Sequence, residues 1–172
     1  YKTAHLDVDK WLDALHHDKQ QINALYVQAK DVTVERDAKL AELKGIIAEK
    51  VRHPKTNRLG RPNRKILLFT ASADTAHYLY EHLHTWALEE LGIHSALVTG
   101  GGTNETTFRP LGYQQATDYN RILTNFSPVS KRRAQIPTLP QEGEIDLLIA
   151  TDCISEGQNL QDCDFLVNYD VH

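Results

Sequence analysis

Residues 145–161 read Ile-Asp-Leu-Leu-Ile-Ala-Thr-Asp-Cys-Ile-Ser-Glu-Gly-Gln-Asn-Leu-Gln, and this stretch predicts both a fold class and a ligand site. Its apolar part, Leu147 to Ala150, has the length and branching of a buried parallel strand. The strand ends at Thr151-Asp152 in a small, polar, glycine-containing turn. Ligands of open α/β sheets bind just beyond the carboxyl ends of the strands, so this turn is the first candidate site.

The side chains of the turn suit an anionic ligand. Gly157 lets backbone N–H groups approach an anion closely. Short hydrogen-bonding groups suited to phosphate and ribose oxygens come from Thr151, Ser155, Gln158 and Asn159. The chemistry alone is equally compatible with an ordinary strand-to-helix loop that has its threonine and aspartate as caps.

The order of residues favours the first interpretation. The pattern Thr-Asp-x-x-Ser-Glu-Gly-x-Asn-Leu-Gln, followed by Leu-Val-Asn-Tyr-Asp at 166–170, resembles motif V of superfamily 2 helicases, nearest to the Swi/Snf-like branch of DNA translocases. Arg-Lys-Ile-Leu-Leu-Phe-Thr at 64–70 is similar to motif IV, the first strand of the second RecA-like domain. His-Ser-Ala-Leu-Val-Thr-Gly-Gly at 94–101 matches the next strand and its Thr-Gly phosphate contact. Arg-Ile-Leu-Thr-Asn-Phe at 121–126 matches the short helix that precedes motif V. The four matches occur in family order over residues 64–171.

The resemblance implies a role for individual residues. In similar proteins ATP lies between two RecA-like domains, and nucleic acid crosses both. The residues implied for ATP are Glu156, Gly157, Gln158 and Asn159, with Mg²⁺ supplied mainly by the other lobe. The residues implied for the nucleic-acid backbone are Thr70, Ser72, Thr99, Gly100 and Thr151.

We therefore expect an α/β, RecA-like parallel sheet with helices on both faces, as the second lobe of an ATP-dependent helicase or translocase. The expected partners are nucleic acid and the N-terminal RecA-like lobe of the same chain. The branch favours DNA, while the sequence leaves RNA open. The Walker A lobe is expected upstream and the arginine-finger motif beyond His172, so the fragment alone is expected to be inactive. The alternative is a non-catalytic nucleic-acid-binding or scaffolding module that keeps only the lobe fold. A Rossmann-type enzyme is disfavoured, because its glycine fingerprint is absent.

Composition sets limits on these expectations. The chain has 172 residues, of which 41% are hydrophobic and 24% charged, as in a globular protein able to form a core. No apolar run reaches the roughly 20 residues needed to span a bilayer, and two cysteines make no disulfide framework. We expect a cytoplasmic or nucleoid-associated protein without a membrane partner. The nine histidines have no metal-ligand spacing, so no metal is expected.

Charge is distributed unevenly along the chain. The net charge is −4, yet residues 52–65 carry six basic residues and no acidic one. This run includes Arg61 and Arg64, which are candidates for tracking phosphates, and a second basic cluster lies at 131–133. Basic loops of this kind are more often simply solvated.

The hydrophobic periodicity predicts three parts. Helices over 8–30 and about 35–52 form a helical hairpin or arm within residues 1–53, and a basic linker spans 54–64. The lobe covers 65–172, with strands at 65–70, 96–99, 145–150 and 165–171 and helices at 73–91 and 116–125. Residues 104–114 have no clear period and are expected to form a loop or an insertion.

Overall fold

The structure is a computed structural model that describes residues 7–30, 36–101, 104–111, 113–154 and 158–170. The chain divides into two compact units, Tyr1–Glu42 and Leu43–His172. In the described residues, no helix is both long enough and apolar enough to cross a membrane.

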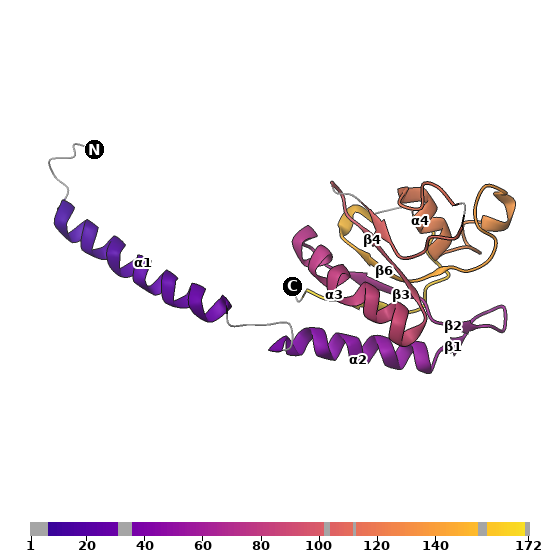
Figure 1. Ribbon diagram of the computed structural model, residues 1–172, viewed down its shortest axis with the longest axis horizontal. Helices are drawn as coiled ribbons and strands as arrows, with labels where there is room; N and C mark the ends of the chain where they lie inside the picture. Colours follow the sequence, from indigo (N-terminus) through magenta and orange to yellow (C-terminus); the bar gives the residue numbers. More distant parts are fainter. Residues whose placement is uncertain (1–6, 31–35, 102–103, 112, 155–157, 171–172) are drawn as a thin grey trace. The chain divides into compact units, whose positions relative to one another are not determined.

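The second unit is built on a five-stranded sheet with the spatial order β5-β4-β6-β3-β7 (Figure 1). Its strands are β3 (Ile66–Phe69), β4 (His94–Val98), β5 (Glu105–Thr106), β6 (Ile145–Ala150) and β7 (Leu166–Asn168). Four of them run parallel, and β5 pairs antiparallel with β4. All six residues of the central strand β6 are buried, as expected for a parallel strand covered on both faces.

Helices cover both faces of this sheet. Strand residues alternate between the faces. On one face, Ile122, Leu123 and Phe126 of α4 (Tyr119–Phe126) form a core cluster with alternate residues of β4 and β6. The helix α3 (Ala73–Leu91) contacts β4 and β6, and its buried residues lie outside that cluster, on the opposite face. The predicted α/β fold with a mostly parallel sheet is confirmed.

The ends of α3 follow from its sequence. Ser72 Oγ accepts a hydrogen bond from Thr75 N at 3.4 Å, so Ser72 is the N-cap. Gly92 ends the helix in the left-handed region, with φ of 63°, where glycine has no steric penalty.

Two helices precede the sheet. The long helix α1 (Val8–Lys30) belongs to the first unit, and Asp7 Oδ1 accepts from Lys10 N at its start. From Leu43 onward, α2 (Ala38–Arg52) belongs to the second unit. There Leu43, Ile47 and Val51 are buried. The division into a hairpin arm, a linker and a lobe remains a prediction.

Several element boundaries differ from the expected ones, for local reasons. α2 begins at Ala38 rather than near residue 35, because Asp37 is its N-cap: Asp37 Oδ1 accepts a hydrogen bond from Leu40 N at 2.9 Å. α4 begins at Tyr119 rather than at 116, because Asp118 is its N-cap: Asp118 Oδ1 accepts a hydrogen bond from Arg121 N at 3.0 Å. The strand β7 has three described residues, against seven expected at 165–171.

Two expected loops contain short strands. The segment 104–114 supplies β5, which forms one edge of the sheet. The expected linker contains a hairpin of β1 (Lys55–Thr56) and β2 (Pro62–Asn63). Strands of two residues leave no periodic signal in a sequence, so the pattern could not reveal them.

Two glycines with nearly equal positive φ test the packing of the segment that precedes β6. Gly143 and Gly60 have φ of +71° and +73°, but an added Cβ at 143 would lie 2.8 Å from Phe108 Cε2, and nothing lies within 4 Å at 60. Phe108 is 3% exposed, so its ring has little room to move. We expect Gly143→Ala to lower the free energy of unfolding by about 3 kcal/mol and Gly60→Ala by about 1 kcal/mol, measured by urea denaturation. Equal losses would show that the ring yields freely.

Candidate functional site

Three threonines lie on adjacent strands at the carboxyl edge of the sheet. Thr99, Thr151 and Thr70 directly follow β4, β6 and β3, whose last residues are paired at one level of the ladder. Thr151 N donates to Val98 O at 3.3 Å, and Thr70 N donates to Ala150 O at 3.1 Å. The three residues are only 7%, 4% and 2% exposed. The structure therefore brings together three of the residues expected to contact the nucleic-acid backbone.

Asp170, the last residue of the Leu-Val-Asn-Tyr-Asp match, is a fourth member of this edge, and the sequence analysis gave it no role. Its Oδ2 accepts from Thr70 Oγ1 at 2.7 Å and from Ala71 N at 2.6 Å. Parallel pairing of β7 with β3 places it there, since Tyr169 N donates to Phe69 O at 2.8 Å. The Thr70 hydroxyl is thus held by a carboxylate, which also fixes the turn into α3. The available signal was an acidic residue near the end of the strand predicted at 165–171.

Thr99 and Gly100 lie against the turn that leaves β6. Thr99 Oγ1 is buried and has no hydrogen-bond partner among the described residues. Gly100 is exposed, and a Cβ added to it would lie 3.2 Å from Cys153 Cβ in the 3-10 turn η4 (Asp152–Ile154). Cys153 Sγ donates to Val98 O at 3.6 Å. A small residue at position 100 lets the end of β4 approach this turn closely.

The remaining predicted contact at this edge, Ser72, is less buried than the threonines. Ser72 is exposed, and its hydroxyl caps α3 as described. Tyr119, at the start of α4, donates from its hydroxyl to Cys153 O at 3.4 Å. Burial, with a contribution from Cys153, raises the pKa of Tyr119.

The residues implied for ATP are only partly described. Glu156 and Gly157 lie outside the described residues. The side-chain amides of Gln158 and Asn159 contact the turn after α4. Lys131 Nζ donates to Gln158 Oε1 at 2.8 Å, and Asn159 Nδ2 donates to Ser130 O at 3.3 Å. Burial lowers the pKa of Lys131. These two side chains are therefore held by the turn at 129–131.

Asp162 completes this second set of contacts. Its carboxylate accepts three hydrogen bonds from this turn. The donors are Val129 N at 2.7 Å, Ser130 N at 2.9 Å and the Ser130 hydroxyl. Its carbonyl accepts from Asn63 Nδ2 at 2.9 Å. Asn63 precedes β3, so Asp162 lies toward the amino edge of the sheet. The chain that leaves β6 at the carboxyl edge thus returns along the α4 face before β7 begins.

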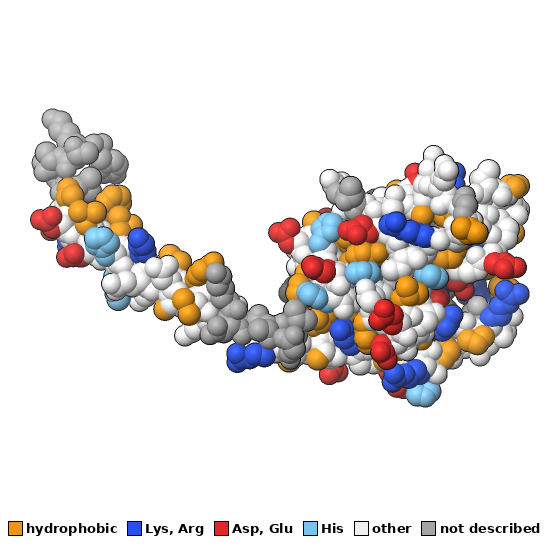
Figure 2. All heavy atoms as spheres, viewed as in Figure 1, with side chains coloured by type: hydrophobic (Ala, Val, Ile, Leu, Met, Phe, Trp, Pro, Cys, Tyr) orange, Lys and Arg blue, Asp and Glu red, His pale blue; other side chains and the backbone are white. Residues whose placement is uncertain are grey.

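The predicted phosphate-tracking arginines lie at the amino edge. Arg61 and Arg64 precede β3, whereas Thr70 follows it, so they are separated by about 13 Å of strand. Arg61 is exposed, while Arg64 Nη2 lies 3.5 Å from Asp146 Oδ2. The structure does not bring these arginines to the threonines. On the face in Figure 2, acidic and basic side chains are interspersed over the sheet unit.

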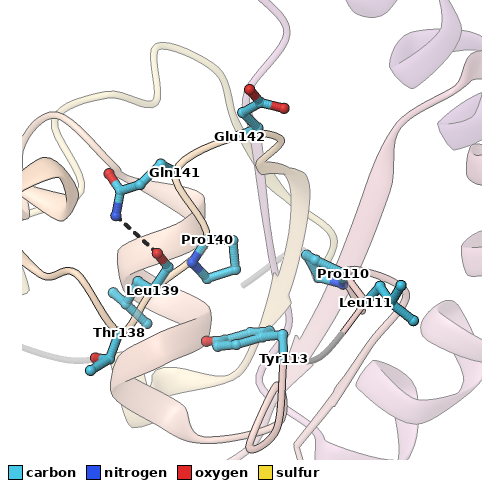
Figure 3. A pocket seen from close by; sticks show the side chains of 8 residues that line it. All are labelled: Pro110, Leu111, Tyr113, Thr138, Leu139, Pro140, Gln141 and Glu142. Carbon is cyan, nitrogen blue, oxygen red and sulfur yellow. Dashed lines mark hydrogen bonds between the residues drawn. The ribbon is translucent and has the colours of Figure 1, made fainter.

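A groove of about 490 Å³ also lies at the amino edge, between the segments at 110–113 and 138–142 (Figure 3). Tyr113, Pro110 and Pro140 line it, and Gln141 Nε2 donates to the Leu139 carbonyl at 2.9 Å beside it. None of the predicted site residues lines this groove. No cluster of three metal-ligating side chains occurs in the described part of the chain.

The fold and this edge define a RecA-like lobe: an open, mostly parallel α/β sheet with polar residues at its carboxyl edge. The family model of the helicase conserved C-terminal domain matches residues 39–172, so the chain belongs to that family. Membership implies a helicase-related role, ATP use by the parent protein and binding of nucleic acid. A search of curated proteins found no match.

The contacts of Asp170 yield a stability prediction. Asp170→Ala removes the acceptor of both Thr70 Oγ1 and Ala71 N, and Thr70 is 2% exposed. We expect the free energy of unfolding to fall by about 2 kcal/mol, measured by chemical denaturation. The control is Asp152→Ala, at an exposed aspartate in η4, with an expected change within about 0.5 kcal/mol. A loss no larger than that of the control would show that the two hydrogen bonds contribute nothing net.

Proposed function

We propose that this chain is the second lobe of an ATP-dependent helicase or translocase that acts on nucleic acid, with DNA favoured over RNA. The row of threonines at the carboxyl edge carries the proposal. Three short hydroxyl side chains on adjacent strands, one of them without a partner among the described residues, suit a ligand with repeated oxygen atoms. Such a ligand is the sugar-phosphate backbone.

In this proposal, Thr99, Gly100 and Thr151 contact one strand of nucleic acid. Thr70 and Ser72 contact it next to them, with Thr70 oriented by Asp170. Backbone contacts set the register without sequence preference, which suits a motor that steps along any sequence. The buried Thr99 hydroxyl would need a side-chain rotation to reach a phosphate.

The bend at 151–159 forms one wall of the ATP site in this proposal. Gly157, beside Glu156, allows close approach of the nucleotide, and Gln158 and Asn159 connect the bend to the turn at 129–131. ATP closes this lobe on the N-terminal lobe, and hydrolysis releases it, which shifts the strand contacts. Mg²⁺ is held mainly by the other lobe. The non-catalytic alternative has the same fold, so activity of the parent protein separates the two.

The test of the nucleotide wall is Gly157→Val in the parent protein. A branched side chain excludes the nucleotide from the bend, so we expect nucleic-acid-stimulated ATPase activity to fall on the order of 10²-fold. The melting temperature should stay unchanged. Gly45→Val is the matched control, because Gly45 is exposed and has nothing within 4 Å of an added Cβ. Unchanged turnover in Gly157→Val would contradict the proposed site.

A second prediction concerns the 172 residues by themselves. They contain no G-x-x-x-x-G-K-[ST] sequence, which cradles the phosphates in proteins of this class. We expect this chain alone to show no ATP hydrolysis above background in a phosphate-release assay, with or without DNA. The parent protein, measured in parallel, should hydrolyse ATP. Stimulated hydrolysis by the chain alone would show that its catalytic groups had been misassigned.

A further inference from the structure

The hairpin β1–β2 presents basic side chains to solvent. Lys55, Arg58 and Arg61 lie on it, and Arg52 ends the preceding helix α2. All four are exposed, and residues 52–65 contain no acidic residue. Figure 1 shows the loop between β1 and β2 projecting from the end of the sheet unit.

The turn of this hairpin is held by the side chain of Asn57. Asn57 Oδ1 accepts from Leu59 N at 2.9 Å and from Arg61 N at 3.0 Å. Two backbone hydrogen bonds close the same turn. Asn57 N donates to Arg61 O at 2.8 Å, and Gly60 N donates to Asn57 O at 3.0 Å. Four hydrogen bonds within five residues hold the arginines on a defined turn.

The basic residues near this hairpin fall into two groups. Lys50, Arg64 and Lys65 each pair with a carboxylate: Asp164 at 2.7 Å, Asp146 at 3.5 Å and Glu144 at 2.8 Å. In contrast, Arg52, Lys55, Arg58 and Arg61 make no ion pair within the described part of the chain. The positive charge that the fold leaves uncompensated in this region therefore lies on and beside the hairpin.

The base of the hairpin is anchored to the lobe. Asn63, at the end of β2, is 6% exposed, and its Nδ2 donates to Asp162 O at 2.9 Å. Its Oδ1 accepts from Lys65 N at 3.2 Å, just before β3. The hairpin thus extends from the amino edge of the sheet, opposite the edge that carries the three threonines.

We propose that the β1–β2 hairpin is a second nucleic-acid contact of this lobe, which binds the phosphates bordering the major groove of duplex DNA. A two-stranded ribbon fits the major groove of B-form DNA, and arginines pair well with phosphate oxygens. The major groove of A-form RNA is too deep and narrow for such an element. This inference rests on the proposed function in one respect only, namely that the partner of the lobe is nucleic acid.

The test measures binding of this chain to a labelled DNA duplex of about 20 base pairs, by anisotropy between about 50 and 200 mM salt. Arg58→Gln/Arg61→Gln should reduce the magnitude of the negative slope of log Kobs against log salt by about 1.8, at about 0.9 for each phosphate that the variant no longer neutralises. Both residues are exposed, so the melting temperature should not change.

Two control variants separate the hairpin from general charge. Leu59→Gln alters the same turn at a 58% exposed residue without removing charge, and Arg132→Gln removes an exposed charge outside the hairpin. Both should leave the slope unchanged. An unchanged slope in the double variant, or an equal fall in Arg132→Gln, would overturn the proposal.

Other nucleic acids test the choice of duplex DNA. An equal fall of the slope on an RNA duplex or on single-stranded DNA of the same sequence would overturn that assignment. The ATPase assay of the parent protein judges the proposed function separately. An inactive parent that still binds DNA through the hairpin would contradict the proposed function alone, and an active parent with an unaffected slope would contradict this inference alone.

Discussion

The parallel pairing of β6 with β4 on one side and β3 on the other is the constraint on which the rest of the lobe depends. It aligns Val98, Ala150 and Phe69 at one level, so the three residues that follow them emerge together. The pairing is stabilised by burial, because α3 and α4 cover opposite faces and every residue of β6 is buried. A shift of one residue in either pairing would move these ends to different levels and separate the threonines.

The two edges of the sheet consequently have different chemistry. At the carboxyl edge lie threonine hydroxyl groups and, beyond Thr70, the Asp170 carboxylate, and Gly100 approaches Cys153 closely. At the amino edge, Lys65 is buried and pairs with Glu144 at 2.8 Å, and it donates to the Ile145 carbonyl at 2.7 Å. Burial raises the pKa of Asp146 in the same group, while Lys65 and Arg64 oppose that rise. Ion pairs thus neutralise the start of β6, and the exposed charges of the hairpin lie beyond them.

The return of the chain from β6 to β7 connects these edges. Contacts of Gln158, Asn159 and Asp162 with the turn at 129–131 hold the segment along the α4 face. Two amides of the predicted bend at 151–159, those of Gln158 and Asn159, thus make hydrogen bonds within the lobe. Periodicity and motif order predicted where the bend begins, but hydrogen bonds between segments about 30 residues apart leave no local pattern.

The sequence by itself determined the helicase-like α/β lobe, the four parallel strands of its sheet and the ends of α3. Each depends on local signals: a short apolar run, a capping serine and a glycine with positive φ. Only the tertiary structure decided which polar residues share an edge. Thr70 and Arg64 are six positions apart yet lie at opposite ends of β3, whereas Thr70 and Asp170 are a hundred positions apart and form a hydrogen bond. Strand direction and pairing set those neighbours, and both arise from long-range packing.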